Sequence, residues 1–400
     1  MSSEKSLTPQ IRFKGFTEAW EQRKAIDLFK DVSEKGFDNL PVLSATQDRG
    51  MVYRDENGIN ISHDKKNELT YKHVIPGQFV IHLRSFQGGF AHSSIEGITS
   101  PAYTVLRFSN ESQHDDIFWK YIFMSERFIK SLETVTYGIR DGRSISYSEF
   151  LGLPFAVPEK EEESHVGYFL KKYDSLITLH QRKLDALKKI KSALLEKMFP
   201  KDGSNIPEIR FTGFTEAWEQ RKLSELLEIN DAKNINLIDS SKTISVSSMS
   251  WNPAGNGASA NSLGSYKVLN YGEMAFEGNR TKGHPYGKLV INDIGTGIMS
   301  SRFRTLKPTS FICVSFWKFY LSNKTIFTPI FLNSTKRGTL MNELVVPDLL
   351  KQSVMLPITD EEQIIIGNFF VCINSLITLH QRKLDALKKI KSALLEKMFV

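Results

Sequence analysis

The pattern of hydrophobic and polar positions predicts two long helices with the same sequence. Residues Ser175 to Phe199 read SLITLHQRKLDALKKIKSALLEKMF, and the same segment returns unchanged at Ser375 to Phe399. Apolar side chains recur every three or four positions through both copies, which is the spacing of a coiled-coil seam and not that of a strand. The seam positions are Leu170, Ile177, His180, Leu184, Leu187 and Leu194 in the first predicted helix, and Phe370, Ile377, His380, Leu384, Leu387 and Leu394 in the second.

Signals for helix ends flank both copies. Pro158 precedes an acidic first turn, and Thr359 and Glu362 have the spacing of a capping box. Pro200 and Gly203 then end the first helix. Neither helix can bury its seam alone, so we predict that the two pack against each other as an antiparallel coiled coil.

Polar side chains on the seam are expected to have structural roles. A lone imidazole at a helix interface usually satisfies a local hydrogen bond, which is the expectation for His180 and His380. Lys191 and Lys391 are expected to extend their charged ends into solvent.

A second repeated segment shows that the whole chain is a duplication. Ile11 to Lys24 returns at Ile209 to Lys222 with only Lys14 replaced, by Thr212. Both repeats recur at about 200 residues, so the chain is one duplicated unit and not a solenoid of short repeats. The sequences between the repeated parts have almost nothing in common, so two constant frames surround two unlike variable modules.

The variable modules are predicted to be mixed α/β. Short runs rich in β-branched and aromatic residues, such as Gln78 to Leu83 and Lys288 to Ile291, alternate with turn clusters and with a helical stretch at Asp116 to Leu132. Gly97-Ile98 has a counterpart in Gly297-Ile298, so we expect the modules to share a fold and to differ in their loops. The predicted division is a first globular domain at 1–158, a first long helix at 159–200, a second globular domain at 201–357 and a second long helix at 358–400.

Basic and amide side chains flanked by glycine gather in the loops of both modules. Arg pairs bidentately with guanine, Asn or Gln pairs with adenine, and nearby Gly lets the backbone approach a duplex. Any one of these residues is more often an ordinary surface residue, so the signal is their recurrence in both halves. The candidates are Gln47, Arg49, Arg84, Gln87, His92, Arg140 and Arg143 in the first module, and Asn279, Arg280, Lys282, His284, Lys336 and Arg337 in the second.

Composition and charge narrow the class of protein. Two separated cysteines, Cys313 and Cys372, exclude a disulfide framework and fit a reducing compartment. We find no signal peptide or membrane-spanning run, so we expect a cytoplasmic protein without a membrane partner. The net charge is +7, and each helix copy has six Lys or Arg against one Asp and one Glu. Such basic helices suit a nearby polyanion, but from charge alone a solvated helix face is the favoured interpretation.

Catalytic motifs are missing from the sequence. The segment from Gly283 to Leu289 is too short between its glycines for a phosphate-binding loop, and neither GxG sequence continues into a dinucleotide motif. The histidines lack zinc-like spacing. We therefore predict a binding subunit with no catalytic residue, no metal and no cofactor of its own.

The two near-identical helices, each after a variable α/β module, and the doubled IRF(K/T)GFTEAWEQRK segment resemble the specificity subunit of type I restriction-modification systems, the HsdS family. The resemblance covers the whole chain. It implies that each module is a target recognition domain reading one half of an interrupted double-stranded DNA sequence. It also implies that the helices set the gap between the halves and dock two methyltransferase subunits, and that restriction (motor) subunits can join the complex.

Two alternatives stay open at the level of sequence. The chain could instead be a two-headed nucleic-acid-binding scaffold without restriction partners, and a stand-alone nuclease or methyltransferase is a more distant third. The identity of the two helix copies exceeds what a coiled-coil seam requires. Recombination that exchanges recognition modules would explain it, and so would a recent duplication.

Overall fold

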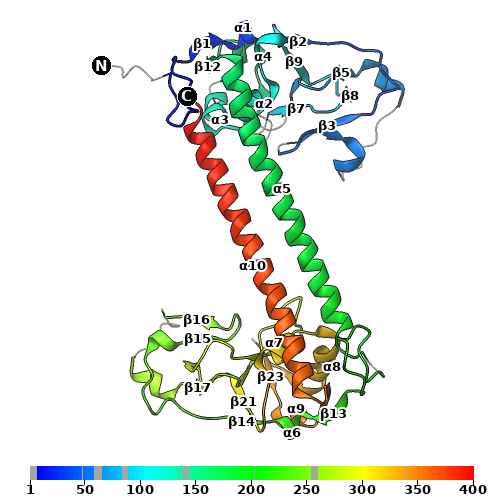
Figure 1. The fold of residues 1–400 in the computed structure, drawn as a ribbon, viewed down its shortest axis with the longest axis vertical. Helices are drawn as coiled ribbons and strands as arrows, with labels where there is room; N and C mark the ends of the chain where they lie inside the picture. The colour runs from blue at the N-terminus through cyan, green and yellow to red at the C-terminus, as the bar shows by residue number, and fades with distance from the viewer. Residues whose placement is uncertain are drawn as a thin grey trace. The chain divides into compact units, whose positions relative to one another are not determined.

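The computed structural model describes residues 7–46, 48–57, 65–82, 89–133, 135–137, 144–201, 203–253, 260–339 and 341–400. The chain forms two compact units, of which the first combines Met1–Gln181 with Arg382–Val400 and the second is Arg182–Gln381. The long helices α5 (Lys160–Lys197) and α10 (Asp360–Lys397) each contribute one part to either unit, so the start of α5 and the end of α10 belong together (Figure 1). The prediction of two long helices is confirmed. Their pairing as a continuous coiled coil stays a prediction.

The first unit is built on a small antiparallel sheet with the strand order β2-β9-β6-β7, and two-stranded sheets surround it. β1 pairs with β12, β3 with β4, β5 with β8, and β10 with β11. The strands are β1 (Glu21–Lys24), β2 (Phe29–Val32), β3 (Leu43–Thr46), β4 (Gly50–Tyr53), β5 (Lys72–Val74), β6 (Phe79–Ile81), β7 (Phe90–His92), β8 (Gly97–Thr99), β9 (Thr104–Phe108), β10 (Thr136–Tyr137), β11 (Ser144–Ile145) and β12 (Pro154–Val157). The shorter helices are α1 (Ala25–Leu28), α2 (Asp116–Met124), α3 (Glu126–Leu132) and α4 (Tyr147–Phe150).

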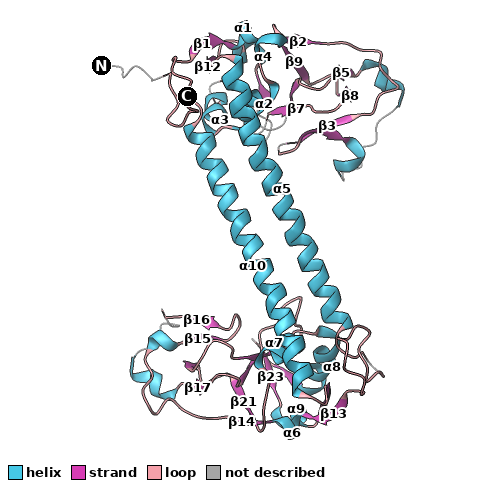
Figure 2. Ribbon diagram, in the orientation of Figure 1, coloured by secondary structure: helices cyan, strands magenta, loops and turns pink. Residues whose placement is uncertain are grey.

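The second unit repeats this architecture element by element. Its central sheet has the order β14-β21-β18-β19, and the pairs β13-β24, β15-β16, β17-β20 and β22-β23 correspond to the smaller sheets of the first unit. Figure 2 draws the strands of both units in magenta. The strands are β13 (Glu219–Lys222), β14 (Leu227–Ile229), β15 (Ile244–Ser245), β16 (Ser250–Trp251), β17 (Lys267–Leu269), β18 (Met274–Glu277), β19 (Lys288–Ile291), β20 (Gly297–Met299), β21 (Arg304–Pro308), β22 (Thr335–Arg337), β23 (Asn342–Leu344) and β24 (Ser353–Leu356). The shorter helices are α6 (Leu223–Leu226), α7 (Val314–Tyr320), α8 (Lys324–Ser334) and α9 (Val346–Leu350).

The matching strand orders confirm that the two modules share a fold despite their unlike sequences. The Gly-Ile pairs that echo each other in the sequence occupy the same place in both sheets. A Cβ atom on Gly97 would lie 2.4 Å from the backbone oxygen of Pro41, and one on Gly297 would lie 2.5 Å from that of Lys242. Both positions therefore exclude any side chain, because a neighbouring backbone passes too close.

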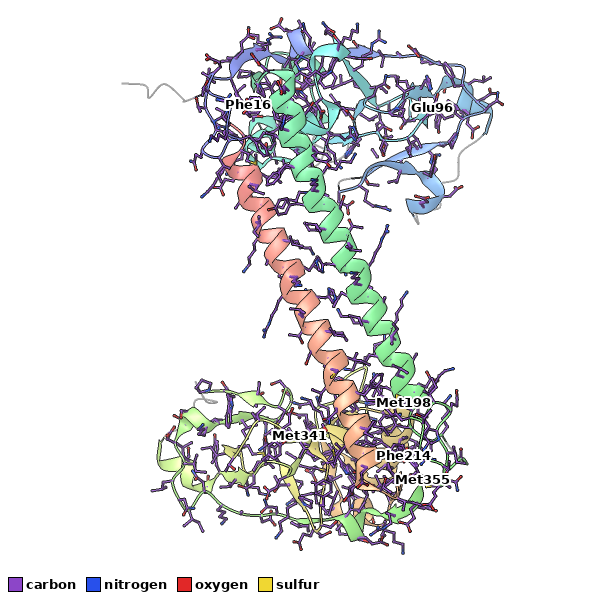
Figure 3. The ribbon with its side chains drawn as sticks, in the orientation of Figure 1. Phe16, Glu96, Met198, Phe214, Met341 and Met355 are labelled. Atoms are coloured by element: carbon purple, nitrogen blue, oxygen red, sulfur yellow. The ribbon has the colours of Figure 1, made fainter. Side chains whose placement is uncertain are left out.

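Each unit has a core rich in aromatic side chains, and the end of the helix from the other half of the sequence completes it. Met398 and Phe399, directly after α10, pack in the core of the first unit together with Leu170 of α5. Met198 and Phe199 pack in the second unit with Phe370, and Figure 3 labels Met198 where α5 reaches this core. Burial of these apolar ends fixes the helices to the modules by the hydrophobic effect.

The repeated segment at the start of each unit is tied to a long helix by a buried ion pair. Arg12 donates from Nε to Glu162 Oε1 at 2.6 Å, and the Trp20 indole donates to Oε2 of the same carboxylate at 3.0 Å. In the second unit Arg210 and Trp218 hold Glu362 in the same way, at 2.7 and 3.3 Å. Both glutamates are almost fully buried, so the pairs belong to the fold and not to the surface.

Three sequence expectations need correction. Lys391 does not extend into solvent: its Nζ lies 2.5 Å from Asp174 Oδ1 and 5.2 Å from the centre of the Tyr121 ring. Lys191 also packs against the protein: its Nζ lies 5.4 Å from the centre of the Phe319 ring, and burial lowers the pKa of Lys191. The helical stretch at 116–132 is two helices, because Ser125 caps α3 with its hydroxyl.

The second long helix would be long and apolar enough to cross a membrane by length and composition alone. The core helix of a soluble protein passes the same test. In α10 the side chains of Ile366, Phe370 and Ile373 are buried in the core of the second unit. The apolar character of this helix is therefore partly explained by its packing within the unit.

Candidate nucleic-acid interface

Most of the residues predicted to contact nucleic acid lie, by their place in the sequence, in or beside three connections that occur in both units. We call these connections the loop set: the first joins β3 to β4 or β15 to β16, the second joins β6 to β7 or β18 to β19, and the third joins β10 to β11 or β22 to β23. Gln47 and Arg49 lie in the first connection, Arg84 and Gln87 in the second, and Arg140 and Arg143 in the third. In the second unit, residues 279–284 lie in the second connection, and Lys336 and Arg337 lie in β22, which leads into the third.

In the second unit two of these connections are locked together by backbone contacts. The Asn342 amide donates to the Gly278 oxygen at 2.9 Å, and a Cβ atom on Gly278 would lie 2.1 Å from the Asn342 oxygen. The Asn342 side chain also donates to the oxygen of Pro285 at 2.9 Å. Asn342 and Pro285 are 57 residues apart in sequence. These contacts therefore bring two distant segments together on one surface.

Arg280 spans these two connections. Its guanidinium lies 3.3 Å from the oxygen of Thr339 and 3.5 Å from that of Gly338, in the turn near Met341 that Figure 3 labels. These contacts use one nitrogen, so the remaining donors of the exposed guanidinium can reach an acceptor outside the protein. Asn279, beside it, is also exposed.

The remaining candidates of the second unit add positive charge to the same surface. Lys282, Lys336 and Arg337 are exposed, and β22 pairs Lys336 with Glu343. Partial burial and the nearby Lys288 and Lys324 lower the pKa of His284, so this imidazole is neutral at physiological pH. A neutral imidazole can donate through one nitrogen and accept through the other, which suits a base edge better than a phosphate.

In the first unit the structure describes less of the loop set. Arg49 is exposed in the β3–β4 turn, next to Gly50, whose φ of 74° requires glycine. A Cβ atom on Gly50 would lie 2.2 Å from the His92 oxygen, so this turn packs tightly on β7. Gln47, Arg84, Gln87, Arg140 and Arg143 lie outside the described residues.

His92 leaves the candidate set, as a correction to the sequence interpretation. Its side chain is 6% exposed, and its Nε2 lies 2.6 Å from Asp116 Oδ2. This contact lowers the pKa of Asp116 and so favours the ionised carboxylate. His92 therefore joins β7 to the start of α2 and cannot reach a base edge.

The seam positions of the long helices divide between the units. Leu170 and Leu394 pack in or against the first core, and Leu194, Phe370 and Ile377 pack in or against the second. Leu184 and Leu384 are both 1% exposed. Ile177, Leu187, Leu387 and the two histidines, His180 and His380, are partly buried. Both histidines make interactions, as their expected structural role requires.

Sequence reasoning missed the β15–β16 turn, which is the counterpart of the turn that holds Gln47 and Arg49. The turn contains serines and no basic residue, so it lacks the pattern of Gly-flanked basic residues that marks the other candidate loops. Within the described part of the chain, no cluster of His, Cys, Asp or Glu side chains could hold a metal ion.

Comparisons with known proteins bear on this arrangement. The fold is similar to that of a type I restriction-modification system S subunit from M. genitalium, with a TM-score of 0.60, 14% sequence identity, and coverage of 98% of this chain and 99% of that chain. A chain from a structural study of complex assembly in the type I R-M system matches with a TM-score of 0.49 and 14% identity over 95% of this chain and 97% of its own. The HsdS subunit from Thermoanaerobacter tengcongensis matches with a TM-score of 0.47 and 14% identity over 95% and 96%.

No protein-family model and no curated protein sequence matches the chain. The structural likeness is therefore between folds whose sequences differ widely, and it extends over 98% of this chain. It confirms, at the level of the fold, the resemblance that the repeated segments carry. The chain has the fold of a type I restriction-modification S subunit.

Proposed function

We propose that this chain is the DNA sequence-specificity subunit of a type I restriction-modification enzyme. Each unit reads one half of an interrupted double-stranded target, and the long helices set the gap between the halves. The observation that carries the proposal is the loop set: one scaffold, built twice, presents unlike side chains at equivalent connections. A protein that recognises two different half-sites in one way needs this combination of a constant scaffold and variable loops.

The long helices support a role in docking two copies of one partner. Both copies expose the same apolar side chains: Leu176 and Leu376 are 43% and 45% exposed, and Ile190 and Ile390 are 51% and 45% exposed. Exposed apolar side chains in such numbers mark interaction surfaces. Because the two copies are identical in sequence, two methyltransferase subunits of one kind fit them better than two unlike partners.

The chain itself performs no chemistry in this proposal. It directs methylation by the methyltransferase subunits, and cleavage by restriction (motor) subunits when these join, as a protein of the cytoplasm that has no membrane partner. Its basic surfaces supply the phosphate attraction that brings the complex to DNA, and this attraction weakens as salt concentration rises.

The proposal is tested by mapping adenine methylation in a strain with and without the gene, by single-molecule sequencing. We expect methylation at one asymmetric, two-part sequence to vanish with the gene, and the purified chain to carry a methyltransferase subunit. Site-specific methylation that survives loss of the gene would contradict the proposal. Nucleic-acid binding by a chain that carries no methyltransferase would favour the two-headed scaffold instead.

A further inference from the structure

The second unit contains an exposed turn at the place where the first unit has a predicted base-reading loop. β15 pairs with β16 through Ile244–Trp251 and Ser245–Ser250, and the four residues 246–249 form the turn between them. β3 and β4 form the corresponding pair in the first unit. Both pairs are anchored alike, since a parallel bridge joins Thr243 to Ile298 and another joins Val42 to Ile98.

The turn is held in one conformation by its own side chains. Val246 and Met249 are buried in a small apolar cluster with Leu269 and Phe303. Met249 has a φ of 45°, a value that a residue with a side chain adopts only when the surroundings hold it there. Ser247 and Ser248, which lie between these two buried side chains, are both exposed.

The turn also touches the strand that follows the basic loop of the second unit. Lys288 Nζ donates to the Ser247 backbone oxygen at 2.7 Å, and Lys288 is the first residue of β19, directly after the 278–287 loop. In the first unit the equivalent turn packs on β7, the equivalent strand, through Gly50 and His92. The first and second connections are therefore neighbours in both units.

The chemistry of the turn suits a base edge. Ser248 Oγ lies 2.7 Å from Ser250 Oγ and 3.1 Å from Ser245 Oγ, so the hydroxyls form a chain that can both donate and accept. Lys242 Nζ, 4.9 Å from the centre of the Trp251 ring, adds positive charge at the base of the hairpin. A serine hydroxyl can pair with a donor or an acceptor on any base, and the rigid turn fixes where it points.

We infer that Ser247 and Ser248, at the tip of the β15–β16 turn, read bases in the half-site of the second unit. The inference rests on the proposed function, and it supplies the first connection of the loop set in the second unit, for which the sequence offered no candidate. Backbone and apolar contacts hold the turn, and the hydroxyls supply the recognition. The 278–287 loop differs, because two of its four candidates, Arg280 and Lys282, are cationic.

The test uses the full chain in complex with its methyltransferase. The double variant Ser247→Ala with Ser248→Ala removes both hydroxyls and leaves Val246 and Met249 in place. Ser301→Ala, at an exposed serine in the turn after β20, is the matched control. Methylation of a library that varies every position of the target is then compared among the parent, the double variant and the control.

We expect the double variant to methylate sites that differ from the target at one or two positions of one half about tenfold more than the parent does. Its preference at the other half is expected to stay the same. Equal loss at all sequences would reduce the turn to a phosphate contact and overturn the inference, as would an unchanged preference. A parent complex without a two-part target would reject the proposed function itself. Thermal unfolding of the variant confirms that the fold is intact.

Discussion

The two units share one backbone design but hold the ends of the long helices with different chemistry. In the first unit Tyr121 donates to Asp174 at 2.7 Å, and Lys391 completes the group. In the second unit the equivalent positions are Phe319, Asn374 and Lys191, so neither the hydroxyl nor the carboxylate is present. The same helix sequence is therefore accepted by a polar surface in one unit and by an apolar surface in the other.

Two further pairs of interacting polar residues in the first unit have uncharged counterparts in the second. His92 and Asp116 of the first unit correspond to Ile291 and Val314, which are both buried in the second core. His114, 3.0 Å from the buried Glu163, corresponds to Ile312, and Gln363 takes the place of the glutamate. Burial raises the pKa of Glu163, and no carboxyl group stands at that position in the second unit. The comparison teaches that the backbone design tolerates either chemistry, provided that each buried polar group has a partner.

The largest predicted effect concerns the ion pair between arginine and a buried glutamate that both units contain. Glu162→Ala and Glu362→Ala each leave a partly buried arginine and a buried tryptophan N–H without their carboxylate, which costs about 3–5 kcal/mol of unfolding free energy. Because the geometry is the same, we expect equal losses in the two units. Hydrogen exchange resolved by peptide would measure each unit separately, with Glu162→Gln and Glu362→Gln as milder controls. A loss confined to one unit would show that the frames are not equivalent.

A smaller effect is predicted where the units differ. Asp174→Asn removes the carboxylate that pairs with Lys391 and should cost roughly 1–3 kcal/mol, because both groups are partly buried and lose a charged hydrogen bond. The reciprocal change, Asn374→Asp, offers Lys191 a partner and should raise its pKa towards the usual value. Urea unfolding of the two single variants gives the energies. Equal changes in unfolding free energy for the two variants would contradict the distinction between a polar contact in the first unit and an apolar contact in the second.

The pH dependence of the units should also differ. His92 holds the pKa of Asp116 below its ordinary value of 3.8, so the carboxylate stabilises the fold above that pH, and this contribution is lost as the pH falls through the folded pKa. Asp116→Asn should therefore reduce the loss of stability on acidification. Unfolding in urea from pH 7 down to pH 3 would measure this. If the variant loses as much unfolding free energy on acidification as the parent, the His92–Asp116 pair does not contribute to the pH dependence.

The smallest predicted effect concerns the outer face of the helices. Ile364 and Ile365 are each 40% exposed at the start of α10, where α5 has Ser164 and His165. Ile364→Ser with Ile365→His should change the free energy of unfolding by less than about 0.5 kcal/mol per residue, because neither side chain belongs to the core. Thermal unfolding checks the stability. A large loss would mean that these side chains are packed when the protein is in solution.

Much of the fold follows from the sequence because its signals are local. The apolar seam of the helices, the Thr359 cap of α10 and the Gly-Ile pairs each reflect contacts that are set by spacing or by backbone crowding. Thr359 accepts from the Glu362 amide as predicted, but the Glu362 side chain binds Arg210 instead of completing the capping box. The equivalent positions of the basic loops were likewise visible as a recurrence. These features need no knowledge of distant partners.

The errors come from partners that lie far away in the sequence. Lys391 is paired with Asp174 across 217 residues, and His92 is buried because Asp116 and β7 meet in the fold. The β15–β16 turn was missed for a different reason. Its position relative to the basic loop depends on strand order, which the serines do not signal.

The central claim is that the frame sets the spacing of the target while the modules set its bases. Four residues inserted after Leu187 and after Leu387 lengthen each helix by roughly 6 Å, which corresponds to about two base pairs of DNA. Mapping the methylation directed by this variant is the most direct test. We predict that both half-sites stay the same and that the gap between them changes; altered half-sites, or an active complex with the original gap, would contradict the account.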